Sequence, residues 1–291
     1  VVAVPSKTAW IYVFDRETGA PIWPIPEQAV PQSTVPGERT SPTQPMPSNP
    51  PPFTRQVVTE DDLIDFTPEI KERALAVFRK YVSGPIFTPP SMKGTITMPG
   101  SIGGAGWGST SFDPETHVLY VKGTNNPVLY RIQKGIPNDT IGYEYTADLV
   151  NSGLGVMVDP DSATPGHTPP PQLPLIKPPY GNMTAIDLNT GKHLWQVTLG
   201  DNAAVRGHPL LKDMDLPPLG VSGAVGGTVT KGGLIFATGG GDVLYALDTT
   251  DGKVLWQFTL PAGRGYANPI SYRGANGVQY VVIASGGGEN A

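Results

Sequence analysis

Short apolar segments, separated by clusters of Gly, Pro, Asp and Asn, make up most of this chain. They are rich in Val, Ile, Leu, Tyr and Phe, which is typical of strands bounded by turns. We count about fifteen such segments, which is enough for several small sheets. The pattern therefore predicts an all-β fold. Clear examples are residues 9–14, 118–121, 182–186, 234–237, 243–247 and 280–284.

One segment departs from this pattern and predicts a short helix. Thr67 is a favourable N-cap and Pro68 a favourable first helical residue. The apolar residues that follow recur at helical spacing, and the helix is expected to end near Ser83, before a Gly-Pro pair. The predicted apolar face consists of Ile70, Ala74, Val77, Phe78 and Tyr81.

The motif D-x-x-[TD]-G-x-x-x-W occurs three times with identical spacing, beginning at Asp15, Asp187 and Asp248. Each copy follows a predicted strand, and a second predicted strand carries the Trp after the Gly. The Asp can accept hydrogen bonds from turn amides, and the Gly can adopt the left-handed conformation that a short turn needs. The motif therefore predicts three β-hairpins, each with a Trp placed to pack on a neighbouring sheet. These residues are Trp23, Trp195 and Trp256.

Repeated hairpins indicate stacked units that bury one another's faces. A weaker hairpin, residues 109–121, lies between the first and second copies. At four strands per blade, the strand count corresponds to about four blades of a β-propeller. Three unrelated hairpins are the alternative, and the identical spacing argues against it.

Two Pro-rich stretches interrupt the β pattern. Residues 24–53 contain the run SNPPP and cannot form the interior of a sheet, so we expect an extended, polyproline-like segment. Together with the predicted helix, this stretch defines a Pro-rich and helical insertion over residues 24–93. A second Pro-rich loop covers residues 158–179.

Composition and charge narrow the possible functions. The 36 Gly and 33 Pro suit many turns, while 38% hydrophobic residues provide a core that disordered chains lack. The formal net charge of −5 offers no basic patch, so nucleic acid is not an expected partner. These 291 residues contain no Cys, which excludes disulfides, thiol catalysis and Cys-ligated metals within them.

Segments along nearly the whole chain resemble the pyrroloquinoline quinone (PQQ) dependent dehydrogenases, and within them the membrane-type quinoprotein glucose dehydrogenases. The Trp-containing hairpin is similar to that family's blade motif. Residues 5–16 (PSKTAWIYVFDR) resemble its K-T-G-x-x-[FY]-V-x-D-R stretch, and residues 103–108 (GGAGWG) resemble its G-G-x-N-W-G loop. The other matching segments are residues 41–45 (SPTQP), 87–91 (FTPPS), 260–263 (LPAG) and 279–283 (QYVVI).

The resemblance implies an eight-bladed propeller that holds PQQ with a Ca²⁺ or Mg²⁺ ion. Such proteins oxidise a sugar, polyol or other alcohol and pass electrons to a quinone or a cytochrome. Residues 1–291 are then the C-terminal portion of one propeller domain and cannot catalyse alone. The general base, the metal ligands and the N-terminal half of the propeller are expected upstream of Val1. The same resemblance implies a periplasmic location, with or without an upstream segment that attaches the protein to the inner membrane.

Lys7 is the residue that we expect to act on the quinone. It matches the family's lysine that reaches the quinone end of PQQ, where a buried ammonium stabilises negative charge developing on oxygen. Ala9 departs from the family, which has Gly two residues after this Lys. A solvated lysine in front of a strand is the alternative.

Gly106, Trp107 and Gly288 are the other expected cofactor-binding residues. Gly106 and Trp107 lie in the loop that matches a cofactor-facing loop, although Gly106 stands where the family has Asn. Gly288 lies in a loop that resembles the family's glycine loop at the mouth of the site. The alternatives are a core Trp between blades and a plain turn. Lys122 stands where relatives often have Asn, and we expect it to face solvent rather than a PQQ carboxylate.

Other clusters lack the pattern of a site. The Gly239–Gly241 run has no following helix and is interpreted as a blade turn. The four His show no metal-ligand spacing. A second function class stays open, because Gly106 removes a side-chain amide: a propeller that lost its cofactor and acts as a binding or assembly scaffold.

Overall fold

The computed structural model describes all residues except 107, 136–143, 151–155, 159–171, 224 and 287–291. The helices are η1 (Glu60–Asp62, a 3₁₀ turn), α1 (Pro68–Phe78) and α2 (Ala203–Arg206). The strands are β1 (Val2–Pro5), β2 (Ile11–Phe14), β3 (Glu27–Ala29), β4 (Thr43–Pro45), β5 (Val82–Ser83), β6 (Thr95–Thr97), β7 (Thr110–Asp113), β8 (Val118–Thr124), β9 (Val128–Lys134), β10 (Tyr145–Val150), β11 (Gly181–Asp187), β12 (His193–Thr198), β13 (Gly227–Thr230), β14 (Leu234–Ala237), β15 (Val243–Asp248), β16 (Val254–Thr259), β17 (Ile270–Arg273) and β18 (Gln279–Val282).

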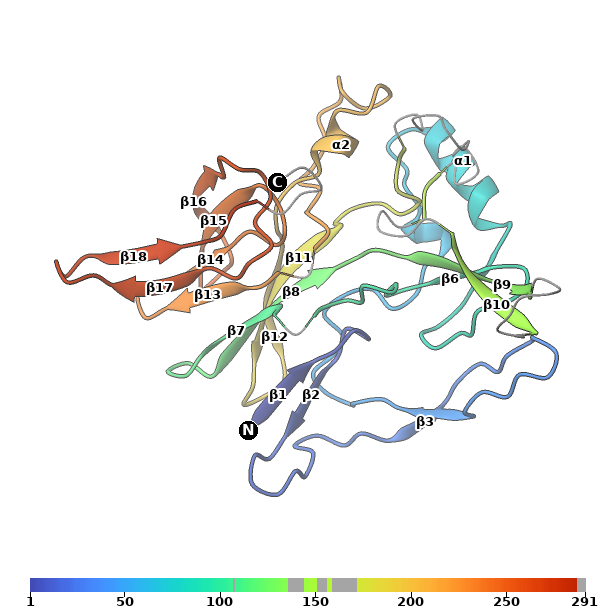
Figure 1. The fold of residues 1–291 in the computed structure, drawn as a ribbon, viewed down its shortest axis with the longest axis horizontal. Coiled ribbons are helices and arrows are strands. Elements are labelled where there is room, and N and C mark those ends of the chain that lie inside the picture. The colour runs from blue at the N-terminus through green and yellow to red at the C-terminus, as the bar shows by residue number, and fades with distance from the viewer. Residues whose placement is uncertain (107, 136–143, 151–155, 159–171, 224, 287–291) are drawn as a thin grey trace.

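Four sheets follow one another as a stack of blades. Within the described residues these are β1-β2, β12-β11-β8-β7, β13-β14-β15-β16 and β17-β18. Strand β13 lies beside β7 on one side and beside β17 on the other, which places the first strands of successive blades next to each other. The β-rich propeller architecture predicted from the repeats is confirmed, and Figure 1 shows β8 and β11 in the middle of the molecule.

The central strands β8 and β11 of the β12-β11-β8-β7 sheet are buried on both faces, which explains the almost uninterrupted apolar run in β8. Leu119 and Val121 join a core cluster with the side chains of β2, while Val118 and Tyr120 join a cluster with β14 and β15. Successive side chains of a strand point to opposite faces. One strand therefore contributes to two interfaces between blades.

The turns of the three repeated hairpins have the predicted chemistry. In the second copy the carboxylate of Asp187 accepts hydrogen bonds from the backbone N–H of Asn189 (2.8 Å) and the hydroxyl of Thr190 (2.7 Å). Asp15 and Asp248 accept equivalent bonds in the other copies. The Gly of each turn has a positive φ: 73° at Gly19, 71° at Gly191 and 75° at Gly252.

Acid should weaken these hairpins. Hydrogen bonds from the turn, chiefly from the Thr190 hydroxyl, hold the pKa of Asp187 below its ordinary value, and the same holds for Asp15 and Asp248. Because the folded-state pKa lies below the unfolded one, the stabilisation is present above about pH 4 and is lost as the pH falls through the folded-state pKa. We expect Asp187→Asn to flatten the fall in unfolding free energy between about pH 5 and 3 in urea titrations. Asp213→Asn, at an exposed loop position, is the control, and an equal slope in both variants would contradict the prediction.

Only two of the three motif Trp residues lie on a returning strand. Trp195 is on β12 and Trp256 on β16, but the first copy forms a single bridge between Phe14 and Pro21 instead of a strand. This bridge is flanked by hydrogen bonds from the N–H of Ile22 to the carbonyl of Val13 (2.8 Å) and from the N–H of Asp15 to the carbonyl of Ala20 (2.8 Å), and the chain bends away before Trp23. The predicted second strand is therefore wrong for the first copy.

Trp195 connects its own blade with the turn of the next one. Its indole N–H donates to the carbonyl of Thr249 (3.0 Å), and its ring lies 5.8 Å from the ring of Tyr120. A Cβ added to Gly252 would lie 2.8 Å from the Trp195 ring. The second and third copies of the motif are thus joined, with the Trp of one hairpin on the Gly turn of the next, whereas Asn49 rather than Trp23 lies on the equivalent turn at Gly191.

Because of this contact, we expect a Gly→Ala substitution to lower the unfolding free energy by different amounts at two equivalent turn positions. Gly19→Ala should cost about 1 kcal/mol of unfolding free energy, because the site has a positive φ but open space around it. Gly252→Ala should cost about 2–4 kcal/mol, because the new methyl group also collides with Trp195. Urea denaturation of both variants measures the difference, and equal costs would show that the contact between blades contributes little.

The predicted helix is present and its apolar face is buried. The Thr67 hydroxyl accepts a hydrogen bond from the N–H of Ile70 (3.2 Å), and Pro68 is the first residue of α1. Ile70, Ala74 and Val77 are buried in a core cluster with β6 and β9. The helix ends at Phe78, before the expected position near Ser83. The sequence analysis missed the single turn α2.

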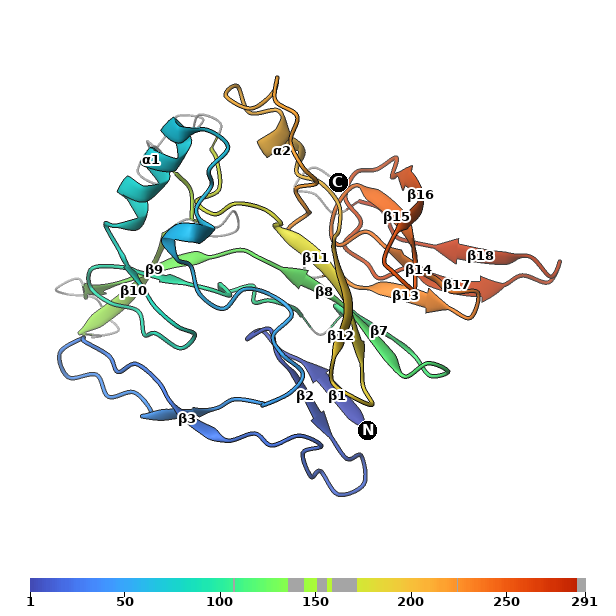
Figure 2. The ribbon, with the colours of Figure 1, turned by 180° about the vertical axis from the view of Figure 1, so that it is seen from behind.

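The Pro-rich segment contains more pairing than expected. Strands β3 and β4 form a small antiparallel ribbon outside the stack, so residues 24–53 are not wholly polyproline-like. Residues 54–93 include η1, α1 and β5, and the sheet β10-β9-β6-β5 packs with α1. Figures 1 and 2 show α1, β9 and β10 at one end of the molecule and β17–β18 at the other.

Candidate functional site

Lys7 lies at the tip of the β1–β2 hairpin. The turn is closed by a hydrogen bond from the N–H of Ala9 to the carbonyl of Ser6 (3.1 Å). Ala9 has a φ of 67°, the left-handed conformation that Gly adopts at little cost. The substitution of Ala for the family's Gly therefore falls where the backbone needs a positive φ, and the turn keeps that conformation.

The Gly-rich loop, residues 103–108, lies directly on this hairpin tip. The N–H of Gly104 donates to the carbonyl of Lys7 (2.8 Å). A Cβ on Gly103 would lie 2.6 Å from the Lys7 Cβ, and one on Gly104 would lie 2.6 Å from the Ala9 Cβ. The first two glycines of the loop thus allow close backbone approach.

Lys7 also lines a cavity of about 240 Å³. Its ammonium donates to the carbonyl of Ser101 (2.9 Å). The resemblance to quinoproteins implied a buried ammonium, but the Lys7 side chain is exposed. Most of the wall is apolar, with Phe87 and Met98 among its members. The cavity therefore combines one cation with an apolar surface. Two of the segments that resemble the quinoprotein family, residues 5–16 and 87–91, both contribute to its wall.

The other expected cofactor residues are only partly described. The N–H of Gly106 donates to the hydroxyl of Ser109 (2.8 Å), and Gly106 offers no side-chain group. Trp107 and Gly288 lie outside the described residues, so their predicted roles stay predictions.

Lys122 is fully buried, so the expectation that it faces solvent is wrong. Its ammonium donates to three carbonyls: those of Gly123 (2.8 Å), Val221 (3.0 Å) and Gly223 (3.0 Å). Burial lowers its pKa to about 7. The sequence contained one signal of this burial, because Lys122 interrupts an apolar run. The other residues of β8 are all buried.

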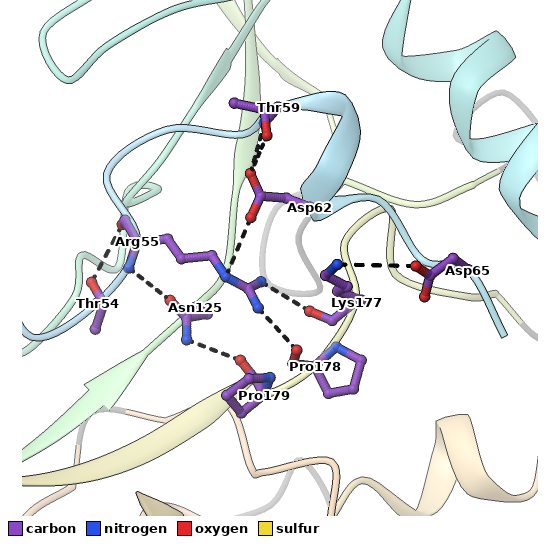
Figure 3. Close-up of polar contacts among 9 residues, drawn as sticks. All are labelled: Thr54, Arg55, Thr59, Asp62, Asp65, Asn125, Lys177, Pro178 and Pro179. Atoms are coloured by element: carbon purple, nitrogen blue, oxygen red, sulfur yellow. Dashed lines mark hydrogen bonds and ion pairs between the residues drawn. The ribbon is translucent and has the colours of Figure 1, made fainter. Parts of the chain in front are cut away.

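A second group that the sequence analysis missed surrounds Arg55 (Figure 3). The guanidinium donates to the carbonyls of Lys177 and Pro178 (both 2.9 Å) and lies 3.6 Å from an Asp62 carboxylate oxygen. The backbone N–H of Arg55 donates to Asn125, which follows β8. These contacts bind the segment before α1 to the segment before β11, which indicates a framework role beside the site.

The remaining polar clusters are structural or exposed. His117 hydrogen-bonds with the Asn189 side chain (3.2 Å), and His193 donates to the carbonyl of Pro51 (3.1 Å). Gly239–Gly241 form a turn after β14, as interpreted from the sequence, with the Gly241 N–H donating to Thr238. Within the described part of the chain, no three His, Cys, Asp or Glu side chains are placed to hold a metal ion. None of the described helices is long and apolar enough to cross a membrane.

The residues at the cavity fit part of PQQ. A planar cofactor with three carboxylates and an ortho-quinone needs apolar faces and cationic donors. The cavity supplies an apolar wall and the Lys7 ammonium, which suits one edge of such a molecule. Among the described residues that line the cavity, Lys7 is the one cationic side chain, so two further carboxylates would need other partners.

Solved structures with a similar fold support the propeller assignment. The chain aligns with a europium-containing methanol dehydrogenase with a TM-score of 0.53 and 21% identity, over 97% of this chain and 36% of that one. It aligns with the quinohemoprotein alcohol dehydrogenase of Comamonas testosteroni with a TM-score of 0.50 and 18% identity, over 98% of this chain and 31% of that one. At these identities the likeness concerns the fold.

Sequence comparisons give higher identities over almost the whole chain. It is 32% identical to the quinate/shikimate dehydrogenase (quinone) of Acinetobacter baylyi over 295 residues, 98% of this chain and 36% of that protein. It is 34% identical to the quinoprotein glucose dehydrogenase of Gluconobacter oxydans over 313 residues, 98% of this chain and 36% of that protein. It is 34% identical to the glycerol dehydrogenase large subunit of Gluconobacter thailandicus, over 98% of this chain and 40% of that protein.

The chain thus spans between 36% and 40% of the length of these relatives. A family model described as "PQQ: Glucose/ethanol/alcohol dehydrogenase, beta-propeller domain" matches residues 1–281. The chain therefore belongs to the PQQ-dependent glucose/ethanol/alcohol dehydrogenase β-propeller family.

Proposed function

We propose that this chain forms the C-terminal part of a quinoprotein dehydrogenase that oxidises a sugar, polyol or other alcohol. When bound, PQQ supplies an ortho-quinone that accepts two electrons from the substrate carbinol. The electrons then pass to a quinone or a cytochrome. The observation that carries the proposal is that Lys7 lines the cavity together with Phe87 and Thr88, while the N–H of Gly104 in the Gly-rich loop donates to the Lys7 carbonyl.

Lys7 has the chemistry for the electrostatic part of this reaction. Its ammonium is held at the cavity by one carbonyl, which leaves two of its three N–H donors for a ligand oxygen. A cation at this place stabilises negative charge that develops on that oxygen. The Gly-rich loop packs directly against the hairpin tip that carries Lys7, because Gly103 and Gly104 have no side chains to separate the two backbones.

The rest of the propeller is the proposed partner. The outer blade leaves Trp256 48% exposed, together with Phe258, Ile270 and Tyr272 on β16 and β17. Trp195 has the turn of the next hairpin as its partner, whereas Trp256 stacks on Phe258 of its own strand. An apolar face of this kind suits the remaining blades of a ring. The general base and the ligands of a Ca²⁺ or Mg²⁺ ion are proposed to come from those blades, in a periplasmic protein with or without attachment to the inner membrane.

Mass spectrometry of small molecules released on denaturation tests the cofactor. The complete protein is purified, incubated with PQQ and Ca²⁺, passed through a desalting column and denatured. We expect about one PQQ per propeller. Recovery of no PQQ would contradict the proposed function.

A cofactor-free scaffold is the second candidate, and Gly106 favours it. The glycine lacks the side-chain amide that relatives place there, and its N–H is already bonded to Ser109. A measurement of PQQ binding by the natural protein and by Gly106→Asn distinguishes the two candidate functions. If the scaffold is correct, Gly106→Asn acquires PQQ binding that the natural protein lacks; if the dehydrogenase is correct, both bind.

A further inference from the structure

Lys122 is a buried cation that has carbonyl groups, rather than a carboxylate, as its partners. An ammonium has three N–H donors, and each of them meets one of the three carbonyls described above. Burial is the sole cause of its lowered pKa, so no described carboxylate compensates its charge. With every donor in use, Lys122 has none left for a ligand.

The cage around Lys122 depends on close approach of the backbone. A Cβ on Gly181 would lie 2.7 Å from the Lys122 Nζ, and a Cβ on Gly239 would lie 2.6 Å from its Cε. A buried, unpaired charge is costly, and its hydrogen bonds must offset most of that cost. The side chain therefore holds together the end of β8, the start of β11, the 221–223 segment and the turn after β14.

The segment that Lys122 holds packs against the Gly-rich loop. The Thr124 hydroxyl donates to the carbonyl of Gly223 (2.6 Å), while the N–H of Thr124 donates to the carbonyl of Gly104 (2.8 Å). Further along, the N–H of Gly226 donates to the carbonyl of Gly108 (3.0 Å). Gly223 is thus connected with Gly104 through Thr124 of β8, and Gly226 is connected with Gly108 directly.

We propose that Lys122 is a positioning residue for the cofactor-facing loop: it clamps residues 221–223 and thereby keeps Gly103 and Gly104 of this loop seated on the Lys7 hairpin. The claim about ligand binding rests on the proposed function, whereas the claim about the loop does not. Removal of a residue that orients a metal ligand typically costs about 10- to 100-fold in affinity or activity, and we expect an effect of the same size for Lys122.

Hydrogen exchange tests the clamp without any ligand. In the complete protein, Lys122→Met keeps the side-chain length and removes the charge and all three donors. We expect amide exchange to rise about 10-fold in peptides covering both residues 221–226 and residues 103–109. Lys192→Met, the same change at an exposed turn position, should alter neither. Faster exchange in 221–226 alone would overturn the proposal, because Lys122 would then stabilise only its own cage.

Equilibrium titration with PQQ tests the consequence for binding. We expect Lys122→Met to raise the Kd for PQQ by about 10- to 100-fold, and Lys122→Gln, which keeps two donors, to raise it less. If the natural protein binds PQQ and both variants bind equally well, the inference fails while the proposed function stands. If the natural protein binds no PQQ, the proposed function fails and the exchange experiment alone decides the role of Lys122. If Lys122→Met does not fold, both measurements are made on Lys122→Gln.

Discussion

Replacing Lys7 by alanine lowers the turnover of the complete enzyme by about 100- to 1,000-fold, which is the loss that follows removal of one well-placed electrostatic donor. The loss should appear in kcat measured per bound PQQ, because the missing ammonium acts on charge that develops during the reaction. Steady-state assays with an artificial electron-accepting dye measure it. A Lys7→Arg variant should recover part of the rate, since a cation returns with a different shape.

Two results decide whether Lys7 has this role. Lys93→Ala removes an exposed lysine that does not line the Lys7 cavity, and its turnover should match that of the natural protein. If Lys7→Ala keeps full turnover at full PQQ occupancy, Lys7 has no part in the reaction. If the variant loses PQQ but keeps kcat per bound cofactor, Lys7 is a binding residue only.

Replacing Phe53 by alanine lowers the free energy of unfolding by about 3–5 kcal/mol, the usual cost of emptying a large core site. Phe53 is only 1% exposed and lies in the cluster between β2, β8 and β11. Its carbonyl also accepts hydrogen bonds from Asn182 (2.9 Å) and Gln196 (3.0 Å), so the backbone around it is anchored to the next blade. Urea denaturation followed by tryptophan fluorescence measures the loss.

Phe112→Ala provides the matched control, because that side chain is 42% exposed on β7. We expect it to cost less than about 1 kcal/mol, since little apolar surface changes its environment. Comparable losses for the two variants would mean that Phe53 is not part of the core that joins the blades.

Local features were predictable because their causes are local. The Asp–Gly hairpin turns depend on hydrogen bonds within five residues and on one positive φ, so the motif alone predicts them. The start of α1 depends on Thr67 and Pro68 in the same way. Its end was less predictable, because the residues after Phe78 leave the helix although the apolar spacing continues to Tyr81.

Two site residues illustrate what the sequence left open. The resemblance to quinoproteins pointed to Lys7, and the cavity beside it supports that choice. It gave no indication that Lys122 is buried, because two of the three carbonyls that accept from its ammonium lie about one hundred residues away in the chain. The apolar run around Lys122 was the one local sign of burial, and the partners of its ammonium could not be identified from that segment.

The all-β class, the repeated hairpins, the helix start and the family could all be predicted from the sequence, because each of these depends on short patterns in fixed order. Which side chains belong to the core and which to the site became clear from the folded chain. It placed Phe53 of the Pro-rich segment between blades and Lys122 inside a carbonyl cage. The physical reason is that burial and charge compensation depend on segments far apart in the chain, which come together only when the blades stack.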